Sequence, residues 1–383
     1  MKKQWLASTA LCAVAGLSLA APAAAQDKMK IGIMGFAKQE FGYVWQRDFD
    51  STAGAPSDRS GFDQQSDVEI QFRGQLKLDN GITVLVHVDL EGETSADQID
   101  EQYMRIFGSF GDIRLGALNA APYLMSYFAP NYGVGIDEAF IQNYISYPGG
   151  GFAGTNSVFM QTARIVADND GNKIAYFTPR LFGFQAGVSY TPDLAQDDDA
   201  FRSGNLRYRD AVSVALNYDN KFGPLYLAGN VGFFYADAPV STPGTGAEDL
   251  KAFNVGANIG YAGFLLGGEF QRYMSGSVIS SANSQTLVAG TSARGTVWNV
   301  GGAYSFGPYG VSLAYYSGSN DGFTAVAGKN EAEWLMLSGK YALGPGIDLY
   351  GSIAHASYDD DIKTTSVGDN DGWATIGGIR ITF

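Results

Sequence analysis

Hydrophobic and polar residues alternate with a period of two along many stretches of the chain. The clearest run is residues 67–78, where apolar positions occupy one parity: Val68, Ile70, Phe72, Gly74, Leu76 and Leu78. Polar positions occupy the other: Asp67, Glu69, Gln71, Arg73, Gln75 and Lys77. Because side chains point to opposite faces along a β-strand, this run predicts a strand with one apolar and one polar face.

A tight turn follows this strand at Asp79-Asn80-Gly81, where Asn and Gly accept the positive φ that such turns require. The alternation then resumes in a partner strand. The C-terminal half repeats the layout, with short turns near residues 220–224, 262–264, 306–308 and 343–346. Longer polar loops separate the hairpins, for example residues 191–210 and 275–295. Short turns at one end and long loops at the other are typical of a transmembrane β-barrel.

The alternating runs predict about sixteen strands, an even number, as single-chain bacterial barrels require. We place them near residues 30–47, 64–78, 82–92, 99–109, 112–118, 172–180, 184–191, 210–219, 224–236, 251–261, 264–274, 295–305, 309–317, 331–343, 347–358 and 373–383. Lipid offers no partner for an open sheet edge, so the sheet must close on itself. An even count puts both chain ends on the short-turn side, which we expect to be periplasmic.

The N-terminus has the pattern of a secretory signal peptide: Lys2 and Lys3, an apolar run from Leu6 to Ala20, and small residues before Gln26. We predict cleavage after Ala25, giving a leader at residues 1–25 and a barrel at residues 26–383. A lipoprotein signal using Cys12 is the alternative. Cys12 is the single cysteine, so the predicted mature chain forms neither a disulfide nor a thiolate metal site. After the leader, no uncharged apolar stretch is long enough for a membrane-spanning helix.

Charge and histidine content exclude several classes of function. The formal net charge is −14, and removing Lys2 and Lys3 with the leader makes it −16, so we expect no nucleic-acid partner. His87 and His355 are the two histidines, and neither neighbours a convincing nucleophile. The parts of a Ser-His or metal-dependent hydrolase are therefore missing, and we predict that the protein is not an enzyme.

The last strand, Trp373 to Phe383, resembles the C-terminal assembly signal of outer-membrane barrels, because its alternating apolar residues end in a terminal Phe. Together with residues 110–116, 172–180 and 184–192, it makes the whole mature chain similar to the general bacterial porin family. The resemblance implies an all-β, sixteen-stranded antiparallel transmembrane barrel that forms a homotrimer. It also implies assembly by periplasmic chaperones and the barrel-insertion machinery, and a third loop that folds inward.

The segment from Asn119 to Asp170 is longer and more apolar than the other predicted loops. Its apolar residues include Pro122, Tyr123, Leu124, Met125, Tyr127, Phe128, Tyr132, Phe140 and Tyr144. Such a loop needs a surface to pack against, and folding into the lumen supplies one. An external lid and a trimer-contact loop are the alternatives. Family porins carry acids where this chain has Tyr127 and Asn131, so their constriction acids are not transferred to it.

If the segment folds inward, Asp137 and Glu138 would face basic residues of the barrel wall, for which we nominate Arg73 and Arg114. A transverse field across a narrow pore would then orient polar solutes. For Arg105 the alternation is ambiguous. Each of these charges could also be a solvated wall residue without selective effect. Further predicted pore-lining residues are Lys38, Glu40, Lys77, His87, Asp89 and Glu91.

These observations predict a Gram-negative outer-membrane porin for passive diffusion of small hydrophilic solutes and ions, with a mild cation preference from its −16 charge. The alternatives are a substrate-specific channel, for example for sugars, and a barrel-anchored structural surface protein. We expect no cofactor and no catalytic or metal site. The runs Asp197-Asp198-Asp199 and Asp359-Asp360-Asp361 could hold surface Ca²⁺ between the barrel and lipopolysaccharide, or be solvated charges. Other expected partners are outer-membrane lipid and the diffusing solutes.

Overall fold

The computed structural model describes residues 28–47, 49–51, 55–57, 60–92, 98–137, 140–145, 162–194, 207–239, 248–277, 290–323, 328–360 and 369–383. The predicted leader, residues 1–25, lies outside them. Within these ranges there is no helix long and apolar enough to cross a membrane.

Antiparallel strands dominate the described residues, with two short helical turns between β7 and β8. The elements are β1 (Lys30–Gln46), β2 (Phe49–Ser51), β3 (Ala55–Ser57), β4 (Gly61–Lys77), β5 (Thr83–Glu91), β6 (Ile99–Gly108), β7 (Gly111–Ala117), α2 (Ala121–Leu124), η2 (Phe140–Asn143), β8 (Asn172–Phe177), β9 (Phe184–Asp193), β10 (Arg209–Phe222), β11 (Leu225–Asp237), β12 (Leu250–Tyr261), β13 (Phe264–Ser275), β14 (Thr291–Phe306), β15 (Tyr309–Phe323), β16 (Asn330–Gly344), β17 (Ile347–Asp360) and β18 (Asn370–Thr382).

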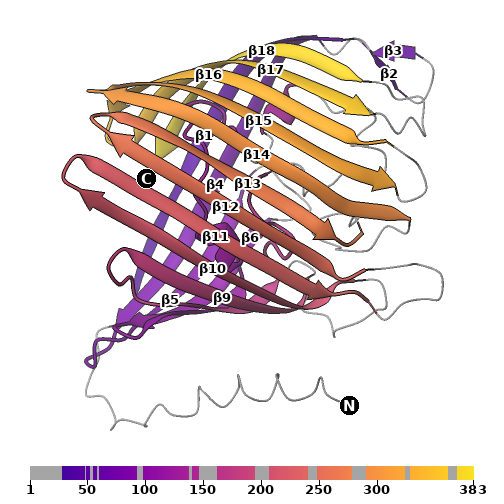
Figure 1. The fold of residues 1–383 in the computed structure, drawn as a ribbon. Coiled ribbons are helices and arrows are strands. Elements are labelled where there is room, and N and C mark those ends of the chain that lie inside the picture. Colours follow the sequence, from indigo (N-terminus) through magenta and orange to yellow (C-terminus); the bar gives the residue numbers. More distant parts are fainter. Residues whose placement is uncertain are drawn as a thin grey trace.

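Sixteen of the described strands form one closed barrel in which each strand pairs with its neighbours in sequence (Figure 1). Closure occurs at β1, which pairs with β4 on one side and with β18 on the other. At the end of this seam, Gly35 and Phe383 exchange two backbone hydrogen bonds of 3.0 Å each. The predicted all-β class, strand number and closure are therefore confirmed, and the C-terminal strand is the one that seals the barrel.

The alternation predicted from the sequence separates an outer face from an inner face. On β12, Val255 and Ile259 are exposed on the outside of the barrel, whereas Asn254 is fully buried on the inside. β14 repeats this with Val300 outside and Asn299 inside. A lipid-facing wall must present apolar side chains, and the closed ladder satisfies the backbone groups beneath them.

The short turns have the backbone that their glycines predict. Gly223 and Gly307, in the β10–β11 and β14–β15 turns, adopt φ of 61° and 58°, the left-handed region that other residues rarely enter. These two-residue turns connect adjacent strands directly, so each turn fixes the register of the strand pair that it joins.

Several strands extend beyond their predicted ends on the long-loop side. β15 continues to Phe323 and β14 begins at Thr291, six and four residues past the predicted limits. These extensions consist mainly of small and polar residues, so the apolar alternation stops although the hydrogen-bond ladder continues. The same reason explains why the small hairpin of β2 and β3 was not predicted.

Candidate channel constriction

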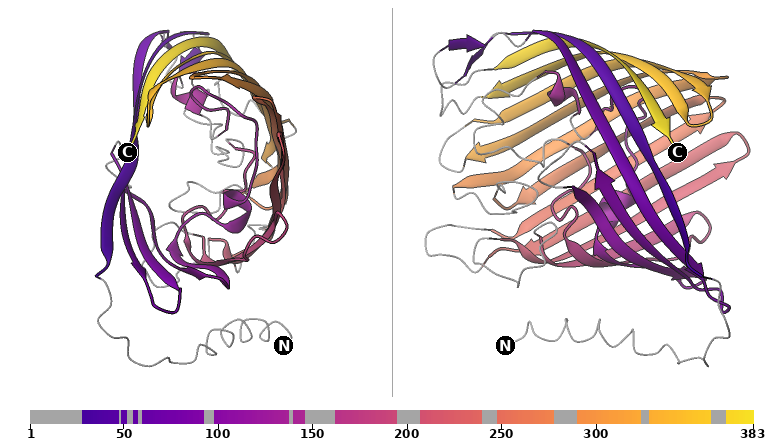
Figure 2. Two further views of the ribbon diagram at one scale, coloured as in Figure 1. Left: turned by 90° about the vertical axis from the view of Figure 1, so that its left-hand side faces the viewer. Right: turned by 180° about the vertical axis from the view of Figure 1, so that it is seen from behind.

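The long segment, residues 118–171 between β7 and β8, is described at residues 118–137, 140–145 and 162–171. Its helical turns α2 and η2 lie within the ring of strands when the barrel is viewed end on (Figure 2, left). The predicted need for a packing surface is met by the inner wall, because Met125, Ile136, Ile141 and Tyr144 are all buried. Ile136, Ile141 and Tyr144 share one apolar cluster with Trp334 and other residues of β14–β18.

A row of polar side chains on the inner wall receives the backbone of the long segment. We call it the polar row: Ser189, Asn230, Asn299, Ser312 and Ser352, from β9, β11, β14, β15 and β17. Each side-chain oxygen accepts one backbone N–H of the long segment, respectively from Ala121 (2.9 Å), Tyr127 (2.8 Å), Ala129 (2.9 Å), Tyr132 (3.0 Å) and Val134 (3.3 Å). Buried N–H groups must find partners, and the row supplies them to five backbone donors of this irregular segment.

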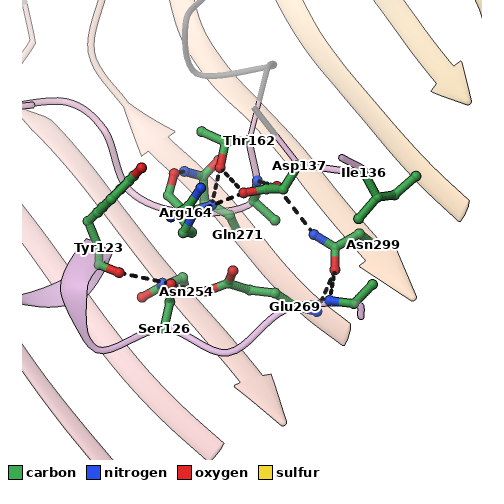
Figure 3. A network of polar contacts seen from close by, with 12 residues as sticks. Tyr123, Ser126, Ile136, Asp137, Thr162, Arg164, Asn254, Glu269, Gln271 and Asn299 are labelled. Carbon is green, nitrogen blue, oxygen red and sulfur yellow. Dashed lines mark hydrogen bonds and ion pairs between the residues drawn. The ribbon is translucent and has the colours of Figure 1, made fainter. Parts of the chain in front are cut away.

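Asp137 is a structural anchor of the long segment. Its carboxylate accepts hydrogen bonds from Arg164 Nε at 2.9 Å and from the backbone N–H of Ala163 at 2.9 Å (Figure 3). The hydroxyl of Thr162 donates to it at 2.5 Å, and Asn299 Nδ2 at 3.4 Å. Asp137 therefore joins two of the described parts of the segment, residues 118–137 and 162–171, to β14. Its neighbour Glu138 lies outside the described residues.

Arg164 is held from three sides. Its guanidinium lies over the rings of Tyr123 and Phe128, at 4.1 and 4.8 Å from their centroids. Its backbone oxygen accepts from Gln271 Nε2 at 2.6 Å. The Asp137–Arg164 ion pair is thus largely buried and compensated within the segment, which leaves little of the Asp137 charge to act across the pore.

The nominated wall arginines belong to separate networks on the inner face of β4–β7. Arg73 Nε donates to His87 Nδ1 at 3.0 Å, and the other ring nitrogen of His87 lies 3.5 Å from Asp89. Arg114 donates to Asp112, with 3.1 Å from Nη2 to Oδ2. In the described residues Asp137 pairs with Arg164 and not with either of these arginines. Because Glu138 lies outside the described ranges, the facing arrangement of the four residues stays a prediction.

The strand register shows which face of the barrel carries Arg105. Arg105 also donates to Asp112, with 2.8 Å from Nε to Oδ2, and it pairs with Arg114 across β6 and β7. Arg105 therefore shares the inner face with Arg114, although its sequence neighbours Tyr103 and Phe107 are aromatic. Asp112 compensates both cations, which the alternation alone could not reveal.

The other predicted pore-lining residues occupy different heights. Glu40 is buried and accepts hydrogen bonds from the hydroxyls of Tyr350 (2.6 Å) and Tyr144 (3.1 Å). His87 and Asp89 are buried in the Arg73 network. Lys77 ends β4 beside a short turn, and Glu91 ends β5 at the opposite end. Of the predicted residues, Lys38 and Asp137 line the cavity described next.

A cavity of about 790 Å³ lies between residues 126–137 of the long segment and the wall formed by β16–β18, β1 and β4. Four charged residues cross this wall as direct neighbours on β17, β18, β1 and β4. We call them the charge row: Asp348, Arg380, Lys38 and Asp67. Lys38 pairs with Asp67 at 2.7 Å, while Arg380 lies 5.0 Å from the Phe36 ring centroid.

Lys340 and Glu69 add a fifth and a sixth wall charge to the cavity, and the Lys340 ammonium lies 4.5 Å from the Tyr132 ring. Counting Asp137 and Arg164, the lining acids are Asp67, Glu69, Asp137 and Asp348, and the bases Lys38, Arg164, Lys340 and Arg380. The lining acids and bases are equal in number, unlike those of the whole chain. The sequence analysis did not nominate six of these residues: Asp67, Glu69, Arg164, Lys340, Asp348 and Arg380. The alternation along the strands could have placed the five strand residues among them on the inner face. It could not have shown that they lie at the same height in the barrel.

The surface Ca²⁺ hypothesis rests largely on residues outside the described ranges, namely Asp197, Asp198, Asp199 and Asp361. In the part of the chain that is described, no group of three or more His, Cys, Asp or Glu side chains is arranged to hold a metal ion.

Comparison with known families adds the decisive observation. The family model described as Gram-negative porin matches residues 7–361, which is nearly the whole chain. The chain belongs to the Gram-negative porin family. The resemblance seen in the sequence motifs is thereby confirmed, and the family and the barrel together place this porin in the outer membrane.

Solved structures similar to this porin share its fold. The anion-selective porin from Comamonas acidovorans has 20% identity and a TM-score of 0.56, covering 93% of this chain and 100% of that one. OmpT of Vibrio cholerae, in a trimer form, has 12% identity and a TM-score of 0.59, with 93% and 100% covered. At these identities the likeness concerns the fold alone.

Curated relatives of this porin include uncharacterized proteins of Rickettsia bellii and Rickettsia typhi. They are 27% and 26% identical over 229 and 232 residues. The matches cover 48% of this chain and 49% and 50% of the relatives, so the chain spans about half the length of the curated relatives it matches.

Proposed function

We propose that this porin is a water-filled, non-enzymatic channel for passive diffusion of small hydrophilic solutes and ions across the outer membrane. The observation that carries the proposal is the cavity of about 790 Å³ between the long segment and the charge row, whose lining combines eight charged side chains with apolar ones. The long segment is the element that narrows the channel. The leader at residues 1–25 would direct export and then be removed.

Selectivity should follow the charges that line the narrow part, because they act on an ion at short range and in a confined volume. The lining bases equal the lining acids, so we propose weak selectivity. Any mild cation preference must then come from the −16 charge outside this cavity. The Comamonas acidovorans relative is described as anion-selective, which makes the sign of the preference a direct test.

A sugar-specific channel would need aromatic faces free for stacking. Several aromatic residues of the long segment are already engaged: Tyr123 and Phe128 hold Arg164, and the Tyr127 hydroxyl donates to Asp219 at 2.7 Å. Tyr132 lines the cavity but lies under Lys340. These engagements favour general diffusion over a stacking track.

We further propose a homotrimer, an assembly that the Vibrio cholerae relative is recorded to adopt. Periplasmic chaperones, the insertion machinery and contact with lipopolysaccharide follow from the same family membership. A seam closed by a C-terminal strand ending in Phe383 is consistent with assembly by that route.

The test is single-channel conductance of the purified protein in a planar bilayer, under a KCl gradient and then with added sugars. Three coupled conductance steps, weak selectivity and no sugar block support a general trimeric channel. Saturable block by one sugar class would instead support the specific channel. A folded barrel that does not conduct would overturn the diffusion proposal and favour a barrel-anchored surface protein.

A further inference from the structure

Lys173, the second residue of β8, is buried inside the barrel wall, with 3% of its surface exposed. Its ammonium donates to the backbone oxygens of Asp168 (3.1 Å), Asn169 (2.5 Å) and Gly171 (2.7 Å), and also to that of Leu118. A buried ammonium is costly unless its three N–H donors are satisfied. Four converging carbonyls supply more than enough acceptors.

These carbonyls come from both ends of the long segment. Leu118 directly follows β7, whereas Asp168, Asn169 and Gly171 directly precede β8. One side chain therefore ties together two points of the chain that are about fifty residues apart. We call this arrangement the clasp: Lys173 with the four carbonyl groups.

Neighbouring contacts fix the clasp to the next strand. Asp168 is also buried, and its carboxylate accepts from the Thr191 hydroxyl of β9 at 2.7 Å. A Cβ at Gly171 would come within 3.2 Å of both the Asp168 oxygen and Thr191, closer than ordinary contacts. A side chain at this position would have to displace these neighbours by a few tenths of an ångström, so glycine suits the close approach of the chain.

The clasp lies close in sequence to the cavity lining on each side. Arg164, which lines the cavity and holds Asp137, is four residues before Asp168. Ala121, three residues after Leu118, begins the hydrogen bonds to the polar row. A shift at the clasp would therefore reach the lining residues through a short, continuous stretch of chain.

We propose that Lys173 is a positioning residue of the channel. Its clasp holds the long segment in position and so limits fluctuations of the channel current between open and partly closed levels. The inference rests on the proposed function, since it assigns to the segment the role of narrowing the channel. Lys173 is not a pore charge, because it is shielded from the lumen. Its loss should alter channel steadiness and leave ion selectivity nearly unchanged.

The experiment compares wild type, Lys173→Ala and the volume-conserving Lys173→Met by single-channel recording. We expect the ratio of partly closed to open time to rise about tenfold or more in both variants, the effect of losing a charge-assisted hydrogen bond. Lys221→Ala removes an exposed lysine near a short turn and is the control that should behave as wild type.

Chemical rescue separates the clasp from a general loss of stability. n-Propylammonium has the atoms that Lys173→Ala removes, so adding it should restore steady current in that variant, whereas 1-propanol should not. A variant as steady as wild type, or one that n-propylammonium leaves unsteady, would overturn the proposal. The proposal would also be overturned if Lys173→Ala shifted the reversal potential as much as removing a charge that lines the cavity.

Hydrogen exchange gives a second readout that needs no conductance. Amides of residues 121–134 should exchange faster in Lys173→Ala and return toward the wild-type rate with n-propylammonium. Unchanged exchange would overturn the clasp even if the wild type conducts. A non-conducting wild type whose exchange responds as expected would reject the diffusion proposal and keep the clasp.

Discussion

Trp334 and Tyr316 stack face to face on the inner wall, with ring centroids 3.7 Å apart and an interplanar angle of 7°. The Trp334 indole N–H donates to the backbone oxygen of Ile136 at 2.8 Å. One wall residue thus packs against its neighbouring strand and holds the long segment by a hydrogen bond. The stacking on Tyr316 and the hydrogen bond to Ile136 should be separable by substitution, because the ring and the indole N–H can be removed in different variants.

Trp334→Phe should keep most of the stacking and lose the indole donor, leaving the Ile136 oxygen unpaired. We expect a loss of about 1–3 kcal/mol in the free energy of unfolding. Trp334→Ala should cost about 3–5 kcal/mol, because it also opens a cavity. Denaturant unfolding in detergent measures both. Trp298→Phe, on the lipid-facing side of β14, is the control, and an equal loss there would contradict the assigned role.

The Asp137–Arg164 pair makes a second prediction. Asp137→Asn should remove the carboxylate charge that the mostly buried Arg164 guanidinium contacts at 2.9 Å, and we expect about 3–5 kcal/mol of destabilisation. The double variant Asp137→Asn with Arg164→Met should recover part of this loss, since the anion and the cation of the pair are removed together. A double-mutant cycle of unfolding free energies measures the coupling. Additive losses would show that the pair is not coupled.

Selectivity should respond to residues of the cavity wall. In water, a unit charge roughly 8 Å from a passing ion contributes about 0.5 kcal/mol, or about twofold in its local concentration. Arg380→Gln and Lys340→Gln should each shift the permeability ratio toward cations, and Asp348→Asn toward anions. Reversal potentials under a KCl gradient report the shift. Glu331→Gln changes an exposed charge on the outer face of β16, and an equal shift there would refute control by the cavity wall.

Periodicity predicted the faces of the strands because side-chain direction is a local property. Arg73 and Arg114 were correctly expected on the inner face, and the glycine turns were expected where they occur. The local pattern does not show how far along the barrel axis a residue lies. That position depends on the register of every strand pair around the barrel. The direct opposition of Arg380 and Lys38 exists only after β18 closes on β1.

The anchoring of the long segment was beyond sequence reasoning for a related reason. The hydrogen bond from Val134 to Ser352 joins residues 218 positions apart, and that from Ala129 to Asn299 joins residues 170 apart. Serine and asparagine on an inner face look like ordinary wetted wall residues. Asp137 looked available to the pore because nothing local indicates that Arg164, 27 residues later, compensates it.

Tyr208 predicts a loss of stability at alkaline pH. It is fully buried beside β10. Its hydroxyl accepts a hydrogen bond from the Ser277 backbone N–H at 2.6 Å and donates one to the Glu248 backbone oxygen at 3.2 Å. Burial, which disfavours the phenolate, raises the pKa of Tyr208 to about 12, although the Ser277 N–H opposes the rise. In the unfolded chain a tyrosine pKa is about 10.

The neutral phenol is therefore favoured by folding. Its contribution is fully present below about pH 10 and is lost as the pH rises from about 10 to 12, by roughly 3 kcal/mol. Other tyrosines also titrate in this range, so the informative quantity is the difference between wild type and Tyr208→Phe. Unfolding free energies from pH 8 to 12 should fall less steeply in the variant, because phenylalanine has no proton to lose. Parallel curves for the two proteins would mean that Tyr208 ionises as readily in the folded barrel as in the unfolded chain.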